Sequence, residues 1–301
     1  MAWTIVSLVL LAGVSPGMAQ EAGPSVERET SAAAETIAAK QPYEVLRDIV
    51  YAEPNGVKLA ADIFQPAGEG PFPGVLMVHG GGWRMGSKRM VSGRAAQLAE
   101  QGYCVMAINY RLAPKHKFPA QWDDCVAALA YMVDNADELK IDKHRLGGFG
   151  YSAGAHLVTL LGTTTKLKLG QEFEAAEQSA ILLKAVVAGG TPTEFRIMPE
   201  DSDFLTYWLG GTRREQPQLY EAATPRIYVS KGDAPMFLFH GSEDALVPLM
   251  AATALANDLR QVGVPFEFFP IQRAGHILAY VDSAAFKAAT EFLDARLKPA
   301  E

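Results

Sequence analysis

The stretch that decides the fold is LGGFGYSAGAHLVTLL, residues 146–161, where an apolar strand-like run meets a helix-like run at the pentapeptide GYSAG. A G-x-S-x-G sequence between a strand and a helix predicts a sharp turn that exposes a serine hydroxyl, here that of Ser152. Gly150 and Gly154 fit this prediction because a side chain would clash in so tight a turn. At average glycine frequencies, such a pentapeptide occurs by chance in about one chain in ten of this length. The pentapeptide therefore indicates a catalytic serine only if an acidic residue, a histidine and an oxyanion hole are found elsewhere in the sequence.

Strand and helix signals alternate on both sides of this pentapeptide. A hairpin is predicted around the turn at residues 54–56. Buried strands are predicted at 72–80 and 103–110, and further strands at 144–150, 184–190, 235–241 and 265–271. Helices are predicted at 88–101, 120–136, 153–161 (ending at Gly162), 249–262 and 286–297. An antiparallel hairpin followed by repeated strand–helix units predicts an α/β fold with a mostly parallel central sheet and helices on both faces.

The segment from about 191 to 233 interrupts the alternation. It contains several prolines, a Gly-Gly pair and aromatic residues that include Phe204, Tyr207 and Trp208. An excursion after a core strand predicts a small cap or lid over the strand ends, where ligands bind in open α/β sheets. Packing is the expected role of the three aromatic side chains, and lining a substrate pocket is the alternative.

The N-terminus, residues 1–19, resembles a signal peptide. The apolar run WTIVSLVLLAGV has the length of a signal-peptide core and is shorter than the roughly 20 residues of a membrane span. No Lys or Arg precedes this run, which leaves a buried or interfacial N-terminal helix as the alternative. Residues 20–42 are rich in Ala and Glu and predict a weakly ordered leader before a domain at 43–301. We therefore expect a periplasmic or secreted protein without a stable membrane span in its mature chain.

Composition excludes several classes of partner. The chain has 301 residues and a formal net charge of -7, and it contains no long run of Lys or Arg, so no nucleic-acid partner is predicted. Cys104 and Cys125 lie in apolar runs and are expected to be buried free thiols, with a disulfide between them as the alternative. No pair of histidines has metal-ligand spacing, so neither a metal nor a cofactor is predicted. No feature of the composition indicates an oligomeric state.

A glycine cluster follows the predicted strand at 72–80. The sequence HGGGW, residues 79–83, lets backbone N–H groups turn towards a substrate oxygen, and the N–H of Ala153 would join them at a developing oxyanion. His79 is expected to shape this loop through a hydrogen bond. A phosphate-binding loop is disfavoured because no Lys-Ser/Thr follows and no G-x-G-x-x-G is formed.

Two further strand ends provide the residues that a nucleophilic serine needs. Asp244 follows the predicted strand at 235–241 and would orient a histidine, with Glu243 as the neighbouring competitor. His276 lies in the predicted loop after the strand at 265–271 and would act as the base. The order Ser152, Asp244, His276 is that of the α/β-hydrolases. His156, four residues after the serine, is expected to be a structural hydrogen-bonding residue.

Taken together, these motifs resemble a known family. The run YRLAPKHKFPAQWDDCVAALAYMVDNADELKIDKHRLGGFGYSAGAHL, residues 110–157, closely resembles the esterases of the hormone-sensitive-lipase and feruloyl/acetyl-esterase-like (BD-FAE-like) branch of the α/β-hydrolases. The resemblance extends over roughly residues 45–297. It implies a serine carboxylesterase with a nucleophile, a base, an orienting carboxylate and three oxyanion donors, which are Ser152, His276, Asp244, Gly81, Gly82 and Ala153, with Gly80 as an alternative donor.

The resemblance implies the chemistry more strongly than the substrate. It favours esters with a short acyl group, on a small molecule or a carbohydrate, and Trp83 and Tyr151 are candidate pocket residues. The HGGGW loop also fits the H-G-G-x-W pattern of kynurenine formamidases, so an aryl formamidase is the alternative enzyme. Ala155 stands where many relatives carry glycine, a change that should affect helix packing little. A non-catalytic binding protein on a hydrolase fold is a minor alternative, because such modules usually lose a catalytic residue.

Overall fold

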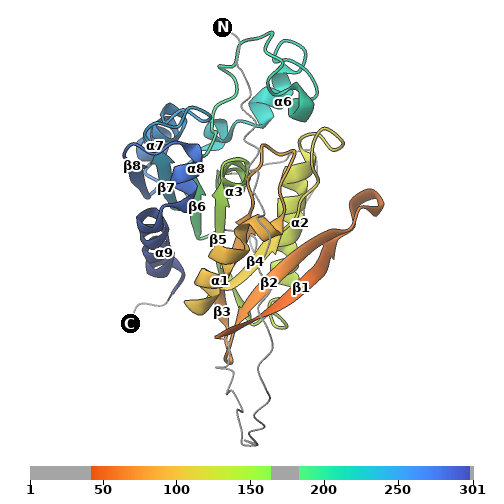
Figure 1. Cartoon of the computed structure of the whole chain (residues 1–301), viewed down its shortest axis with the longest axis vertical. Helices are drawn as coiled ribbons and strands as arrows, with labels where there is room; N and C mark the ends of the chain where they lie inside the picture. The colour runs from red at the N-terminus through yellow and green to blue at the C-terminus, as the bar shows by residue number, and fades with distance from the viewer. Residues whose placement is uncertain (1–41, 164–182, 299–301) are drawn as a thin grey trace, which may run out of the picture. The chain divides into compact units, whose positions relative to one another are not determined.

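The strands in the described part of the chain pair into a single sheet (Figure 1). The computed structural model describes residues 42–163 and 183–298, so the predicted signal peptide and, apart from Pro42, the predicted leader lie outside the described residues. Within the described ranges the strand order is β1-β2-β4-β3-β5-β6-β7-β8. The strands are β1 (Tyr43–Ala52), β2 (Leu59–Pro66), β3 (Phe72–Val78), β4 (Cys104–Ile108), β5 (Ile141–Tyr151), β6 (Ala185–Gly189), β7 (Met236–Gly241) and β8 (Phe266–Ile271).

The sheet is parallel except at one edge. Strands β1 and β2 form the predicted antiparallel hairpin, whose turn is the 3-10 segment Pro54–Gly56, and β2 pairs antiparallel with β4. Every other pairing, from β4 through β3, β5, β6 and β7 to β8, is parallel. The loops that leave these parallel strands therefore emerge at one common edge of the sheet, which is the edge that carries the predicted site.

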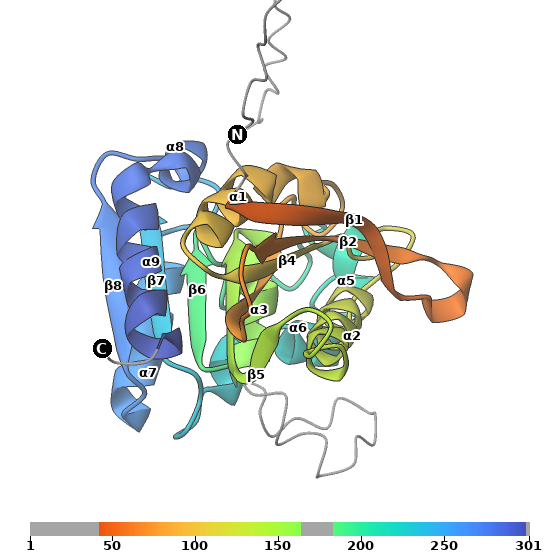
Figure 2. The same cartoon turned by 90° about the horizontal axis from the view of Figure 1, so that it is seen from below.

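Helices cover both faces of the sheet, as predicted. Alternate strand residues face opposite sides: Leu76 and Val78 belong to one buried cluster, whereas Val75 and Met77 belong to the other. The first cluster includes residues of α2 (Ala120–Asp134), α3 (Ala153–Thr163) and α7 (Met250–Val262), and the second includes residues of α1 (Ser92–Glu100) and α9 (Ser283–Leu297). Figure 2 shows α1 and α2 on opposite sides of β4.

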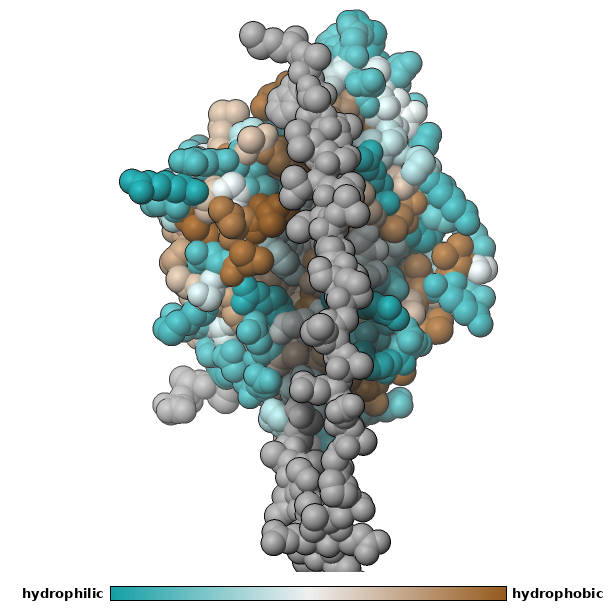
Figure 3. All heavy atoms as spheres, in the orientation of Figure 1, coloured by the Kyte–Doolittle hydropathy of each residue, from teal (hydrophilic) through white to brown (hydrophobic). Residues whose placement is uncertain are grey.

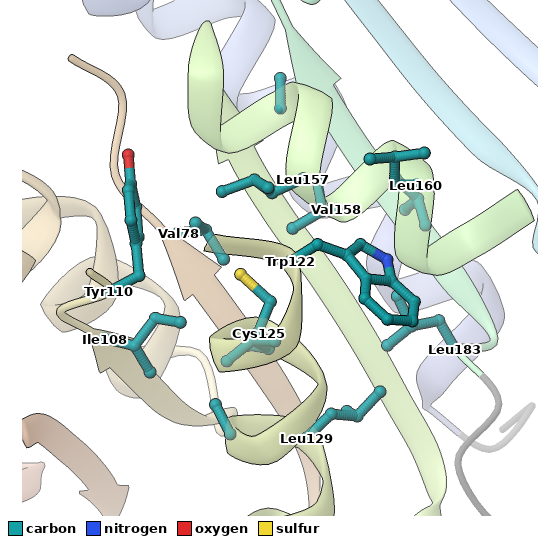
Figure 4. Packing of buried hydrophobic residues seen from close by; sticks show 14 of the residues in the cluster. Val78, Ile108, Tyr110, Trp122, Cys125, Leu129, Leu157, Val158, Leu160 and Leu183 are labelled. Carbon is teal, nitrogen blue, oxygen red and sulfur yellow. The ribbon is translucent and has the colours of Figure 1, made fainter. Parts of the chain in front are cut away.

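The larger cluster places helix α2 against the centre of the sheet. Cys125 points between Val78 of β3 and Ile108 of β4, and Trp122 lies beside α3 (Figure 4). Cys104 and Cys125 are both buried free thiols, which confirms the prediction and excludes the alternative disulfide in this structure. No helix within residues 42–163 and 183–298 combines the length and apolar character that crossing a membrane requires.

Two element predictions were wrong. Helix α3 does not end at Gly162 but continues through it to Thr163. Glycine is present there because of packing: a Cβ at Gly162 would lie 2.7 Å from Cγ2 of Val186 on β6. The predicted loop at His276 is in fact the start of the short helix α8 (His276–Val281).

The predicted cap consists mainly of turns and short helices. It contains α5 (Thr206–Leu209), α6 (Pro217–Ala222) and the 3-10 segment η3 (Pro225–Tyr228). Residues of this segment belong to the same buried cluster as α2 and α3, including Trp208, Leu209 and Tyr220. The cap is therefore part of the core on that side of the sheet.

Candidate active site

Ser152 occupies a strained turn between β5 and α3. Its φ of 54° lies in the left-handed region, which residues other than glycine rarely adopt. The N–H of Ser152 donates a hydrogen bond of 2.8 Å to the carbonyl oxygen of Gly189 on β6. A Cβ at Gly150 would overlap the backbone of Gly154, and one at Gly154 would overlap the carbonyl oxygen of Val78. The sharp turn predicted from the pentapeptide is present, and its flanking glycines are required by close backbone approach.

His276 and Asp244 form a hydrogen-bonded pair. His276 Nδ1 lies 2.6 Å from Oδ2 of Asp244, whose side chain is buried. The other carboxylate oxygen, Oδ1, accepts hydrogen bonds from the backbone N–H groups of Leu246 (2.9 Å) and Val247 (2.8 Å). Glu243, the competing carboxylate, is exposed. The geometry therefore selects Asp244 as the partner of His276.

A second histidine approaches the same carboxylate. His240 Nε2 is 3.4 Å from Oδ2 of Asp244 and 2.8 Å from the carbonyl oxygen of Val247, to which it donates. The His240 side chain is fully buried, and burial lowers its pKa below the usual value for histidine. His240 is therefore a neutral residue that supports the loop around Asp244. The sequence showed no chemical role for it.

Tyr151 connects the serine turn to His276. The hydroxyl of Tyr151 donates to the backbone carbonyl of His276, and the two ring centroids are 5.1 Å apart. A Cβ at Gly190 would lie 2.9 Å from the Tyr151 ring and 3.0 Å from Cε1 of His276, so a side chain at this position would disturb both residues. Through this hydrogen bond the buried Tyr151 supports the backbone of His276. Its predicted place in a substrate pocket stays a prediction.

The HGGGW loop is held by contacts on both of its sides. His79 Nδ1 donates to the carbonyl oxygen of Gly80 (2.7 Å), and the His79 ring stacks on Tyr110 with centroids 4.2 Å apart. Burial lowers the pKa of His79 to about 4, so this ring is neutral at pH 7. The predicted loop-shaping role of His79 matches this geometry. Gly81 has a φ of 119°, and a Cβ there would overlap the carbonyl oxygen of Met85.

Several backbone donors in this region have no protein acceptor. Among the described residues, none accepts a hydrogen bond from the N–H groups of Gly80, Gly81, Gly82 or Ala153. Ala153 is the first residue of α3, where backbone N–H groups are free by helix geometry. A Cβ at Gly80 would lie 3.4 Å from Cβ of Ser152, so the glycine loop lies directly beside the serine. These donors can bind an anionic oxygen next to Ser152.

Trp83 belongs to a buried aromatic cluster. Its ring stacks on Trp208 of the cap with centroids 3.7 Å apart, and its Nε1–H donates to Nδ1 of His156 (3.3 Å). His156 in turn donates from Nε2 to the carbonyl oxygen of Ala223 (2.7 Å), and burial lowers the pKa of His156 to about 4. The structural role predicted for His156 is thus observed. Trp83 is 4% exposed and has a packing role, so its predicted place in a substrate pocket gains no support from the structure.

The cap contacts the glycine loop directly. The hydroxyl of Tyr207 donates to the carbonyl oxygen of Gly82 (2.9 Å), and the guanidinium of Arg84 lies over the Tyr207 ring at 5.0 Å. Trp208 is fully buried, whereas Phe204 is exposed. Packing therefore accounts for Tyr207 and Trp208, as expected, but not for Phe204. The contact between Tyr207 and Gly82 could not be read from the sequence, because 125 residues separate the two.

A mostly parallel sheet with an antiparallel hairpin at one edge, a serine turn after β5, and Asp244 and His276 after β7 and β8 define an α/β-hydrolase. The chain belongs to the BD-FAE family, whose model matches residues 61–259. Both the predicted fold class and the predicted BD-FAE-like branch are confirmed.

Known relatives are similar in both sequence and structure. Esterase LipC of Mycobacterium tuberculosis is 31% identical over 223 residues, which are 71% of this chain and 55% of LipC. A truncated carbohydrate esterase from gut microbiota has a TM-score of 0.77 at 25% identity, covering 87% of this chain and 99% of that chain. A butyrate-bound thermophilic esterase from Thermogutta terrifontis has a TM-score of 0.70 at 25% identity, covering 86% and 97%. The chain spans about half the length of the curated relatives it matches.

Proposed function

We propose that this protein is a serine carboxylesterase that hydrolyses esters through an acyl-enzyme. The observation that carries the proposal is the 2.6 Å hydrogen bond between His276 and Asp244 at the sheet edge where the turn of Ser152 also lies. In this proposal Ser152 is the nucleophile, His276 the general base and Asp244 the residue that orients the base. Esterases among the relatives in both sequence and structure support this assignment.

The tautomer of His276 follows from its hydrogen bond. Because Nδ1 donates its proton to Asp244, the lone pair of the neutral ring is on Nε2, and Nε2 is the atom that takes the proton of Ser152. The imidazolium formed in that step is stabilised by the carboxylate. Two backbone N–H groups hold the carboxylate in place, so little reorganisation accompanies the proton transfer.

The oxyanion would be held by the free backbone donors beside the serine. Attack of Ser152 on the ester carbonyl places a negative charge on the carbonyl oxygen, and the N–H groups of Gly81, Gly82 and Ala153, with Gly80 as the alternative, provide its hydrogen bonds. Removing one such donor from a hydrolase typically costs roughly 100- to 1,000-fold in rate. Because these donors belong to the backbone, their positions are set by the loop contacts of His79 and Tyr207.

The proposed reaction proceeds through two acyl transfers, the first to Ser152 and the second to water. His276 returns the proton to the leaving alcohol as the tetrahedral intermediate collapses, which leaves the acyl group on Ser152. Water enters, His276 takes one of its protons, and the second tetrahedral intermediate releases the acid and restores the serine. All protons move through one histidine.

The substrate we propose is an ester with a short acyl group on a small molecule or a carbohydrate. Two of the structural relatives support this choice, since one is described as a carbohydrate esterase and the other is a butyrate-bound esterase.

The test is Ser152→Ala together with a fluorophosphonate probe. Hydrolysis of p-nitrophenyl acetate should fall to background in this variant, and the probe should label the wild type at Ser152 only. Ser230→Ala, which removes a hydroxyl bonded to Asp233 in a turn, should keep wild-type activity and labelling. Turnover by a clean preparation of Ser152→Ala would overturn the nucleophile assignment. Faster hydrolysis of N-formylkynurenine than of p-nitrophenyl acetate or acetylated xylan would replace the ester assignment with the formamidase.

A further inference from the structure

A pocket outside the candidate active site lies where the start of β2 meets the segment that follows β4. These two strands are antiparallel neighbours, so the first residues of β2 lie beside the end of β4. The pocket has a volume of about 470 Å³, which is within the range of small-molecule sites. Ser152, Asp244 and His276 do not line it. Its lining, which we call the β2–β4 pocket, consists of residues 57–59, 86–87, 109–113 and 115–116.

The β2–β4 pocket shares a wall with the glycine loop. A Cβ at Gly86, in the lining, would lie 2.7 Å from the carbonyl oxygen of Gly80. The ring of Tyr110, also in the lining, stacks on His79, and its hydroxyl donates to the carbonyl oxygen of His79 (3.1 Å). The pocket therefore borders the loop that carries the proposed oxyanion donors without containing a proposed catalytic residue.

The lining contains basic residues and no acidic one. The basic residues are Lys58, Arg111, Lys115 and His116. Arg111 is balanced by the buried carboxylate of Asp124, at 2.6 Å. Lys58 and Lys115 are exposed, and neither forms an ion pair within residues 42–163 and 183–298. In a chain with a net charge of -7, two uncompensated lysines at one pocket favour an anionic ligand.

The hydrogen-bonding groups of the lining point to the same class of ligand. In the part of the chain that the structure describes, no residue accepts a hydrogen bond from the Ser87 hydroxyl, the Asn109 amide or Nη1 of Arg111. The carbonyl oxygen of Asn109, by contrast, already accepts from the Tyr51 hydroxyl (2.6 Å). That of Arg111 accepts from Nε2 of Gln121 (3.0 Å). A ligand that offers acceptor oxygens, as an anion does, would meet free donors here.

The rest of the lining is largely aliphatic. Val57, Leu59, Leu112 and Ala113 supply apolar side chains. The right-hand edge in Figure 3, where Figure 1 shows the hairpin of β1 and β2, carries hydrophobic and hydrophilic side chains next to one another. An inorganic anion would use only the donors, whereas an organic anion would also cover the aliphatic walls. The lining therefore favours an organic anion.

Helix α2 holds the longest part of the lining in place. The backbone N–H and the guanidinium of Arg111 both donate to Asp124 of α2. Nε2 of Gln121, on the same helix, donates to the carbonyl oxygens of Arg111 (3.0 Å) and His116 (2.6 Å). The pocket is thus built on anchored backbone, so little ordering of the protein would accompany binding.

We propose that the β2–β4 pocket binds a small organic anion, with its carboxylate or phosphate group among the free donors and its carbon skeleton against the aliphatic walls. Both head groups present acceptor oxygens when ionised, so the same donors suit either. The site is additional to the proposed esterase function and does not depend on it. Its occupant would touch Gly86 and Tyr110, through which the pocket contacts the glycine loop.

The experiment is isothermal titration calorimetry of the purified protein with four probes, which are cyclohexanecarboxylate, cyclohexyl phosphate, neutral cyclohexanecarboxamide and inorganic phosphate. At least one of the two organic anions should bind at one site per chain. It should bind about tenfold more tightly than the carboxamide, which lacks the charge, and than inorganic phosphate, which lacks the carbon skeleton. The tighter of the two organic anions identifies the head group. Raising the salt concentration to about 1 M should weaken its binding, because charges are then screened within about 3 Å.

Two double variants locate the anion. Lys58→Gln/Lys115→Gln removes the two uncompensated charges from exposed positions and should weaken binding about tenfold. The matched control, Lys143→Gln/Lys231→Gln, removes two exposed lysines that do not line the pocket, and its affinity should stay within about twofold of wild type. Protein labelled at Ser152 with the fluorophosphonate probe should keep wild-type affinity, because the pocket lies outside the candidate active site.

Four results would each overturn the proposal. They are no binding of either organic anion, equal affinity for the carboxamide or inorganic phosphate, unchanged affinity in Lys58→Gln/Lys115→Gln, and an equal loss in the control variant. Loss of binding on labelling would place the anion at Ser152 and overturn it as well. Failure of the esterase function is recognised separately. Wild-type protein would then not hydrolyse p-nitrophenyl acetate, while calorimetry, which requires no turnover, would still report the anion.

Discussion

Among single residues, Tyr151 shows how one side chain can connect the turn of Ser152, the proposed nucleophile, to His276, the proposed base. It immediately precedes Ser152, and its hydroxyl reaches across to the backbone carbonyl of His276, so the two segments cannot shift independently. The Tyr151 ring also packs on Tyr280 of α8, with centroids 5.0 Å apart. The position of the imidazole therefore depends on two anchors, Asp244 on the ring and Tyr151 on the backbone.

Tyr151→Phe keeps the ring and removes only the hydrogen bond. We expect kcat for p-nitrophenyl acetate to fall about fivefold with little change in KM, because a hydrogen bond contributes about 1 kcal/mol and here acts on the base rather than on the substrate. The measurement is steady-state kinetics across pH 5–9, in which the profile should change with kcat. Tyr228→Phe removes an equivalent hydroxyl bond to the carbonyl of Ala222 and should leave both constants unchanged. Equal kinetics in the two variants would show that Tyr151 has no positioning role.

The residues of the candidate site differ in how far the sequence could predict them. Ser152, Asp244 and His276 could be named because each stands directly after a predicted strand, and the ends of parallel strands meet at one edge. The role of Tyr151 could not be predicted from the sequence, because it depends on a contact between residues that are 125 apart in the chain. His240 was missed although it stands only four residues before Asp244, because a histidine at the end of a strand has no periodic signal and the sequence does not show that the turn after β7 brings its ring to within 3.4 Å of the carboxylate.

Among the elements, Gly162 in α3 and Gly93 in α1 show that a glycine within a helix can be explained by close packing in one case and not in another. Gly162 suggested a helix end, since glycine favours helix ends over helix interiors. The structure shows it inside α3, where the helix lies so close to β6 that only glycine fits. Gly93 lies in α1 with no atom within 4 Å of the position of a Cβ, so no packing reason keeps it glycine.

Replacing glycine by alanine is expected to have opposite effects on the free energy of unfolding at these two positions. Gly93→Ala should raise the free energy of unfolding by about 0.5 kcal/mol, because alanine is the better helix former and its methyl group meets open space. Gly162→Ala should lower it by about 1–3 kcal/mol, because overpacking against Val186 outweighs the helix preference. Urea denaturation monitored by circular dichroism measures both. If both substitutions were stabilising, close packing could not be the reason for Gly162.

Helix α8 is an element that sequence periodicity could not predict. Its six residues are too few for a 3.6-residue repeat, and the run HILAYV is apolar apart from its first residue. Three of its apolar side chains are exposed, which is the reverse of what an apolar run usually indicates. The strands and long helices, by contrast, were placed within a few residues, because most of the strands are short apolar runs bounded by turn residues and the long helices repeat apolar residues at helical spacing.

At the scale of the whole molecule, His156 joins parts of the fold that are far apart in sequence. It stands on α3, accepts from Trp83 after β3, and donates to the carbonyl of Ala223 in the cap. The bond from Trp83 requires the neutral ring, with the lone pair on Nδ1 and the proton on Nε2, whereas donation from Nε2 to Ala223 is possible in either charge state. Burial penalises the charged ring and lowers the pKa of His156 to about 4. A proton on Nδ1 would also abolish the bond from Trp83.

This pKa predicts a loss of stability in mild acid. The folded value of about 4 lies below the value of about 6.5 expected in the unfolded chain, so the unfolded state binds the proton first as the pH falls. The stabilisation is complete above about pH 6.5 and decreases by up to about 1.4 kcal/mol per pH unit until the pH nears the folded pKa. Urea denaturation at pH 7 and pH 5 should therefore show a fall in the free energy of unfolding that is smaller by about 1–2 kcal/mol in His156→Gln than in wild type.

His79, whose pKa is lowered in the same way, remains in both proteins and contributes equally. His144→Gln, at an exposed position, should retain the wild-type fall. If His156→Gln lost as much stability as wild type between the two pH values, His156 would not be the group that couples the cap, the glycine loop and α3 to pH.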